Sequence, residues 1–120
     1  MSLEPLRGLT ELRTLYIQSD SDTAALSLAP LSGLTKLTEL NINSCSIQNG
    51  DLSALSGLTE LRTLQVYHRE WVGNDYNNRV YIRDLSPLSE LTKLNSLTIS
   101  GTAEGIDTSP VSYVSNLEIR

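Results

Sequence analysis

The chain has one thiol and one imidazole that could serve nucleophilic catalysis, at Cys45 and His68. Such catalysis needs a nucleophile, a base and a third group that orients the base. The two residues are 23 positions apart, and there is no second histidine. A single cysteine also excludes an internal disulfide and a thiolate metal cage. The sequence therefore predicts a protein that is not an enzyme and has no catalytic residues.

The sequence also lacks the common motifs for binding metals and cofactors. Asp20-Ser21-Asp22 could supply two carboxylates to calcium, but the further oxygens and the bidentate glutamate of a calcium site do not follow. There is no phosphate-binding P-loop, no G-x-G-x-x-G, no H-E-x-x-H and no Cys-x-x-Cys. We expect a polar loop at 20–22, no metal site and no cofactor.

Charge and hydropathy exclude two classes of partner. Nine basic and 14 acidic residues give a net charge of −5. Nucleic acids and anionic membranes need a basic surface, so neither is an expected partner. No apolar run approaches the roughly 20 residues that span a bilayer, so membrane insertion is not expected. Residues 1–15 alternate apolar and polar types, which does not resemble a signal peptide.

The sequence thus has few residues that could do chemistry, but it contains a clear internal repeat. One pattern occurs at residues 3–17, 28–42, 52–66 and 85–99, with starts 25, 24 and 33 residues apart. Apolar residues, mostly leucine, recur every three positions and then once at a spacing of two. A fifth, shortened copy follows Pro110. A self-similar period of this length is typical of a stacked repeat protein.

The change of spacing predicts the local structure of each unit. A spacing of two places side chains on one face of a strand, and a spacing of three favours a 3₁₀-like turn. The same position of the repeat is proline in three copies, at Pro5, Pro30 and Pro87. Proline suits the first position of a helical segment. Pro110 is closer to its strand, so we expect the last helical segment to be one turn shorter.

The motif Leu37-x-x-Leu40-x-Ile42-x-x-Cys45-x-Ile47 resembles the leucine-rich repeat family, in its internalin-like and phosphatase-regulator-like short forms. The resemblance implies an α/β fold: a solenoid of about five coils with a parallel sheet on the concave face and 3₁₀ or short helical segments on the convex side. It covers one domain, residues 1–120. The repeats lie at about 3–27, 28–51, 52–84, 85–108 and a truncated 109–120, with an insertion at 68–83.

The family's ladder position, usually asparagine, holds different residues in this chain: Asp20, Cys45, Arg69 and Thr102. The repeat pattern implies that Cys45 is buried in the core and that His68 lies at the surface, where its strand ends. Arg69 is not expected to point inward.

Residues between the inward leucines would face the concave side, and this row is polar with two tyrosines. It is either a solvated sheet face or a recognition face, because tyrosine among asparagine and glutamine suits protein or glycan ligands. The candidate partner-binding residues on and beside it are Tyr16, Gln18, Asn41, Asn43, Gln65, Tyr67 and His68.

The insertion holds the only tryptophan and further tyrosines, which adds Trp71, Tyr76 and Tyr81 to the candidates. Residues 69–72 and 79–82 are strand-prone and flank a turn-rich segment, so we expect a β-hairpin. The hairpin either projects from the solenoid or folds back so that Trp71 covers its flank.

Two functions follow from these features. The first is a non-enzymatic module that binds a protein, or a glycan, of unknown identity through the concave face and the insertion. The alternative is a structural spacer in a larger surface protein, with no ligand of its own. The internalin-like resemblance favours a bacterial surface or secreted location. Leucines on an uncovered first coil would favour end-to-end self-association.

Overall fold

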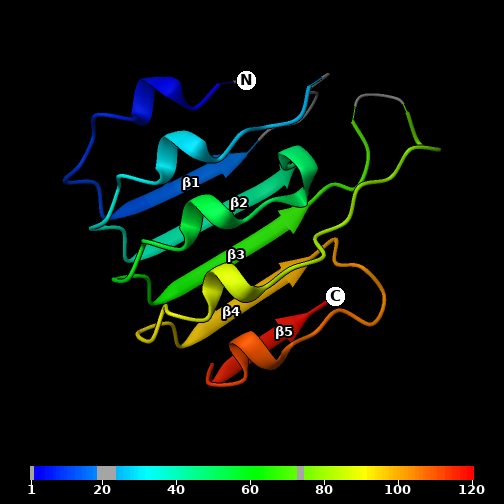
Figure 1. Ribbon diagram of the computed structural model, residues 1–120. Helices are drawn as coiled ribbons and strands as arrows, with labels where there is room; N and C mark the ends of the chain where they lie inside the picture. Colours follow the sequence, from blue (N-terminus) through cyan, green and yellow to red (C-terminus); the bar gives the residue numbers. More distant parts are fainter. Residues whose placement is uncertain (1, 19–23, 73–74) are drawn as a thin grey trace.

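Five short strands lie side by side in one parallel sheet, in the order of the chain (Figure 1). The computed structural model describes residues 2–18, 24–72 and 75–120. The strands are β1 (Thr14–Gln18), β2 (Glu39–Cys45), β3 (Thr63–His68), β4 (Ser96–Ser100) and β5 (Asn116–Ile119). The expected parallel order of five coils is confirmed.

Short 3₁₀ segments form a second layer over one face of the sheet (Figure 1). They are η1 (Glu4–Leu6), η2 (Ala29–Leu31), η3 (Gln48–Gly50), η4 (Ser53–Leu55), η5 (Ser86–Leu88) and η6 (Ser109–Val111). Proline is the second residue of η1, η2, η5 and η6, as its preset φ allows. The last coil is shortened in the loop between η6 and β5, not in its helical segment as expected.

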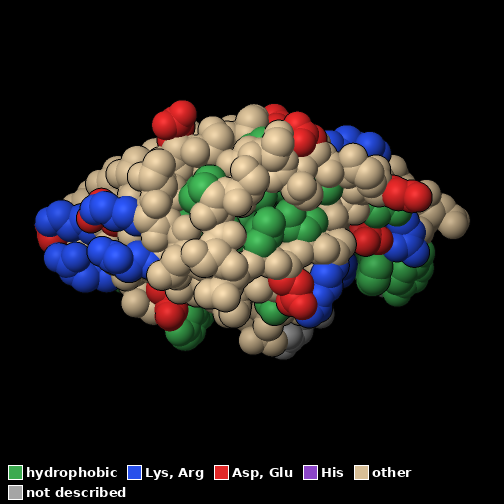
Figure 2. Space-filling model, turned by 90° about the horizontal axis from the view of Figure 1, so that it is seen from below, with side chains coloured by type: hydrophobic (Ala, Val, Ile, Leu, Met, Phe, Trp, Pro, Cys, Tyr) green, Lys and Arg blue, Asp and Glu red, His purple; other side chains and the backbone are tan. Residues whose placement is uncertain are grey.

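A continuous leucine core fills the space between the two layers. Leu15, Leu40, Leu64, Leu97 and Leu117 are register partners on successive strands. The middle three are fully buried, whereas Leu117 on the last coil is 39% exposed. Seen from the β5 end, apolar side chains gather at the centre of the surface (Figure 2). The leucines of the three inner strands are therefore covered by a coil on each side, whereas those of the two end strands are covered on one side only.

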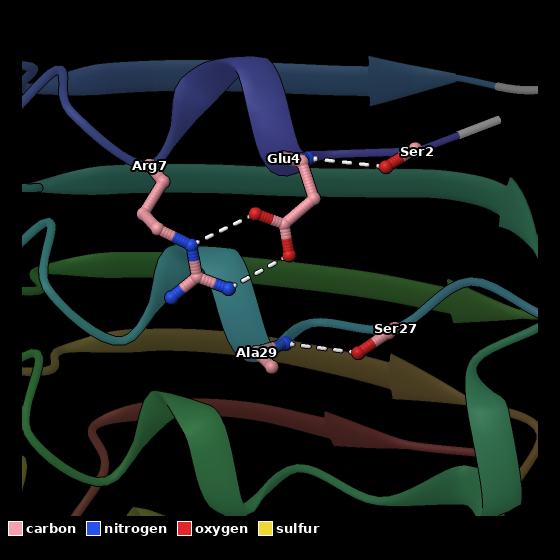
Figure 3. A network of polar contacts seen from close by, with 5 residues as sticks. All are labelled: Ser2, Glu4, Arg7, Ser27 and Ala29. Carbon is pink, nitrogen blue, oxygen red and sulfur yellow. Dashed lines mark hydrogen bonds and ion pairs between the residues drawn. The ribbon is translucent and has the colours of Figure 1, made fainter.

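Five of the six 3₁₀ segments, all except η3, begin in the same way, by a hydrogen bond that the leucine pattern does not reveal. A side-chain oxygen two residues before the segment accepts the backbone N–H of its first residue, at 2.9–3.3 Å. Figure 3 shows this bond from Glu4 to Ser2 and from Ala29 to Ser27. The acceptors share one phase of the repeat: Ser2, Ser27, Asp51, Asp84 and Asp107.

Cys45 is buried in the core, as the ladder position implied. Its Sγ lies 3.4 Å from the carbonyl oxygen of Asn43. Ser44, between them, has a φ of +60°, and the pairing of β2 with β3 shifts by one residue there. The thiol therefore faces the core.

His68 is buried, and the expectation that it lies at the surface is wrong. Its Nδ1 accepts the backbone N–H of Ile47 at 3.0 Å, and its Nε2 lies 2.7 Å from the carbonyl oxygen of Val80. Both bonds form when the ring is neutral and Nε2 carries the hydrogen. The imidazole thus joins the second coil to the insertion.

Acidification is expected to destabilise the protein through His68. Burial lowers the pKa of His68 below its ordinary value of 6.5, against weaker opposite effects from the Val80 carbonyl and Glu70. The unfolded chain then binds this proton more readily than the folded protein. The free energy of unfolding therefore falls as the pH drops from about 6.5 towards the lower folded pKa, and is unaffected by His68 above that window.

Urea unfolding at a series of pH values between about 5 and 8 measures this effect. His68→Gln is the control, because glutamine has a donor and an acceptor but does not titrate in this range. The slope of stability against pH should be smaller in the variant. Equal slopes for both proteins would contradict a role for His68.

The insertion does not form the expected hairpin over its described residues, because neither 69–72 nor 79–82 is a strand. Val80 donates its N–H to the carbonyl of Glu70, and Arg79 pairs with the Glu70 carboxylate at 2.8 Å. Ile82 is buried and bridges Thr102 in parallel. The segment extends beyond the carboxyl ends of the strands (Figure 1). Its arms are therefore held by a few specific contacts in place of a ladder.

Candidate functional site

Strand alternation places one set of polar side chains on the sheet face opposite the core, which we call the concave face. Parallel register aligns them in rows across the strands. The middle row is Tyr16, Asn41, Gln65, Thr98 and Glu118. The row before it is Thr14, Glu39, Thr63, Ser96 and Asn116, and the row after it is Gln18, Asn43, Tyr67 and Ser100.

The candidate residues on this face differ in exposure. Tyr16 is 67% exposed, and Gln18 is also exposed. The remaining four are half-buried between neighbouring side chains: Asn41, Asn43, Gln65 and Tyr67. His68 is not available to a partner, because it lies in the core.

Two side-chain hydrogen bonds cross the strands on the concave face. Tyr16 donates its hydroxyl to Oε2 of Glu39 at 2.5 Å, and this bond raises the pKa of Tyr16. Asn41 donates from Nδ2 to Oε1 of Gln65 at 2.7 Å. Glu39 was not among the candidates, although its place between inward residues is the signal that could have found it.

These four side chains surround a hollow of about 90 Å³ over β1, β2 and β3. Its lining residues are Tyr16, Glu39, Leu40, Asn41, Thr63 and Gln65. Asn41 is one of these lining residues, and its buried Oδ1 has no hydrogen-bond partner among the described residues; Oγ of Ser46 is the other described side-chain atom in this state. A buried acceptor without a donor is rare, because its lost hydration is not replaced. The hollow therefore has one hydrogen bond unfilled.

The insertion gathers the other aromatic candidates. The rings of Trp71 and Tyr76 are 5.4 Å apart, and the guanidinium of Arg79 lies 5.3 Å from the Trp71 ring centre. Tyr76 is exposed and Trp71 half-buried. Tyr81 instead lies beneath Arg83, at 5.8 Å. Trp71, Tyr76 and Arg79 thus form one small cluster beyond the strand ends, and Tyr81 belongs to a separate contact.

Charged side chains pair between coils on the loops that lead into the strands. Lys36 pairs with Glu11, and Lys93 with Glu60, each at 2.7 Å. These ammonium groups lower the pKa of both carboxyls through hydrogen bonds. Lysine and arginine side chains gather at this end of the molecule (left in Figure 2). Exposed pairs of this kind contribute little stability, so they mark a solvated edge.

Two larger hollows lie away from the concave face. They have volumes of about 280 and 310 Å³ and lie among the loops that carry η2, η4 and η5, and serine, asparagine and aspartate dominate their lining. Within residues 2–18, 24–72 and 75–120, no three His, Cys, Asp or Glu side chains cluster as metal ligands would. Asp20-Ser21-Asp22 lies outside the described residues. None of the described helices has the length and apolar character needed to cross a membrane.

Comparison with known proteins identifies a solved structure with a similar fold. The chain is similar to internalin C2 from Listeria monocytogenes, with 27% identity and a TM-score of 0.68. The match covers 98% of this chain and 45% of the internalin C2 chain, so it spans less than half of that neighbour. No family model and no curated protein matches the sequence. Together with the five parallel strands, the similarity confirms the leucine-rich repeat solenoid.

Proposed function

We propose that this chain is a non-enzymatic interaction module that binds a protein partner through its concave face and its insertion. The observation that carries the proposal is the hollow on the concave face, where a buried acceptor lacks a donor. A buried acceptor of this kind calls for a donor, and a group of a bound partner can supply one. The internalin-like fold supports a scaffold role, since solenoids present extended surfaces to their ligands.

The residues assigned to binding are those that face a partner: Tyr16, Gln18, Asn41, Asn43, Gln65, Tyr67, Trp71, Tyr76 and Tyr81. The sheet supplies tyrosines among amides, and the insertion supplies the cluster of Trp71, Tyr76 and Arg79. Tryptophan, tyrosine and arginine are the types enriched at interface hot spots. A glycan ligand would use the same aromatic and amide groups.

The alternative, a structural spacer without a ligand, predicts scattered aromatic side chains. The contact of Trp71 with Tyr76 and Arg79 favours a binding surface over a spacer. A bacterial surface or secreted location is the setting that the internalin-like fold favours. End-to-end self-association stays a prediction; Leu9, 48% exposed on the first coil, is the residue through which it would act.

The same charge placed on two faces tests the proposal. Thr98→Arg puts a bulky cation in the middle of the concave face, and Ser56→Arg puts it beside η4 on the other side. Labelled wild-type protein is applied to an array of purified surface proteins and glycans. Ligands retained by wild type should be lost by Thr98→Arg and kept by Ser56→Arg. Ligands lost equally by both variants, or by Ser56→Arg alone, would refute the concave face as the binding site.

A further inference from the structure

We infer that the hollow between β1, β2 and β3 receives the ammonium group of a lysine side chain from the partner protein. The inference rests on the proposed function and adds the chemistry of the contact. A lysine ammonium carries three N–H donors and a positive charge on a flexible stem. The hollow supplies what such a group needs, which is a set of acceptors with a negative charge among them.

Glu39 supplies the charge. No described lysine or arginine forms an ion pair with it, and its recorded partner is the hydroxyl of Tyr16. The glutamates of the strand-leading loops, Glu11 and Glu60, are by contrast each neutralised by a lysine of the next coil. Glu39 is therefore a carboxylate whose counter-charge is not provided within the described part of the chain.

Asn41 supplies the unfilled acceptor. Its Nδ2 is used by Gln65, so the amide is held in place while Oδ1 stays without a donor. Burying an unpaired acceptor is unfavourable, and a ligand N–H aimed at that oxygen would recover what is lost. An anionic or purely apolar ligand group would leave the cost in place. The chemistry of the hollow thus selects for a donor.

The arrangement of acceptors around the hollow favours lysine over arginine. A water-sized group takes about 30 Å³, so 90 Å³ admits an ammonium with its last methylenes. The ammonium can direct separate N–H groups at Glu39, Asn41 and Gln65, which approach from two strands. A guanidinium is a planar fork that suits one carboxylate face on. Three separated acceptors match the ammonium better.

Tyr16 admits the ligand and then contacts it. Its side chain is 67% exposed and its one recorded hydrogen bond is to Glu39, so turning outward breaks no core packing. The incoming ammonium replaces the hydroxyl as the donor to Glu39, and the freed ring lies against the lysine stem. The net charge of −5 attracts a basic partner at long range and repels an acidic one.

Nuclear magnetic resonance of the ¹⁵N-labelled chain tests the inference with small probes. The probes are Nα-acetyl-lysine methylamide, the same compound acetylated at Nε, and Nα-acetyl-glutamate methylamide. The lysine probe should shift the side-chain amide signals of Asn41 and Gln65 in a saturable way, and the other two should not. Equal shifts with the Nε-acetylated probe, shifts with the glutamate probe, or no shifts with lysine would overturn the inference.

Variants locate the response. Asn41→Ala should weaken the lysine probe about tenfold, followed through the Gln65 side-chain amide and the backbone of β2. Glu39→Gln should weaken it about threefold to fivefold, because the ammonium loses its counter-charge. Asn95→Ala is the matched control, since it removes an exposed asparagine that lies just before β4 and does not line the hollow, and it should leave the affinity unchanged. Equal losses in Asn41→Ala and Asn95→Ala would contradict a specific site.

The outcome separates this inference from the function on which it rests. If Thr98→Arg abolishes ligand binding on the array while the lysine probe leaves Asn41 and Gln65 unshifted, the concave face binds a partner and the lysine site is refuted. If the lysine probe titrates the hollow while Thr98→Arg changes nothing on the array, the lysine site stands and the proposed interaction surface is refuted.

Discussion

Replacing Leu40 by alanine is expected to lower the free energy of unfolding by about 2–5 kcal/mol. Leu40 is fully buried and its register partners are Leu15 and Leu64, so the core closes on it from both sides. Deleting its three outer carbons loses their burial and leaves a cavity that two anchored strands cannot close. Urea denaturation, with the slope checked for a constant value, measures the change.

Leu9→Ala is the comparison for this prediction. Leu9 follows the same repeat pattern but is 48% exposed on the first coil. Its loss should cost less than about 1 kcal/mol, because little burial is removed. A cost below 1 kcal/mol at Leu40 would show that the leucine stack is not the main source of stability.

Gly101→Ala is expected to destabilise the protein by at least about 2 kcal/mol, because strain and a clash act together. Gly101 has a φ of +85°, a region that residues with a Cβ rarely adopt. A Cβ there would lie 2.5 Å from the carbonyl oxygen of His68 and 2.8 Å from its ring carbon Cδ2. The fourth coil therefore fits against the third only without a side chain at this point.

Gly57→Ala separates this effect from the general cost of losing a glycine. No atom lies within 4 Å of the Cβ that alanine would add there, and the position needs no positive φ. That variant should be neutral or slightly more stable, since alanine restricts the unfolded chain. Thermal unfolding of both variants makes the comparison. Similar melting temperatures for the two would contradict the close approach at Gly101.

The strands and the core were predictable from the sequence because the spacing of leucine encodes them directly. A change from period three to period two marks where the chain extends, and four copies fix the register of the sheet. Cys45 followed from the same pattern and is buried as expected. What the pattern of leucines cannot reveal is polar contacts, such as those of the serine and aspartate acceptors that begin five of the six 3₁₀ segments.

The predictions of a surface His68 and of a hairpin in the insertion were wrong for one shared reason. The partner of the imidazole is the carbonyl of Val80, twelve residues further along in a segment outside the repeat. Strand propensity in residues 69–72 and 79–82 gave no sign of this, so a hairpin was expected and a buried histidine was not. Contacts with a segment outside the repeat cannot be predicted from the spacing of the leucines.

The candidate site was predictable in outline only. Alternation along a strand places Tyr16, Asn41 and Gln65 on one face, which is a property of each strand alone. The hollow depends on which side chains pair across strands, and those pairings leave Oδ1 of Asn41 without a donor. That detail depends on side-chain conformations that residue types do not determine.

The core contains no tryptophan or phenylalanine, and this decides what optical methods can detect. Trp71 lies in the insertion, against Tyr76 and Arg79, while leucine fills the solenoid. Tryptophan fluorescence will therefore follow loosening of the insertion, whereas far-ultraviolet circular dichroism follows the sheet. A fluorescence transition that precedes the dichroism transition would report detachment of one segment, and it should not be taken for a partly folded state of the solenoid.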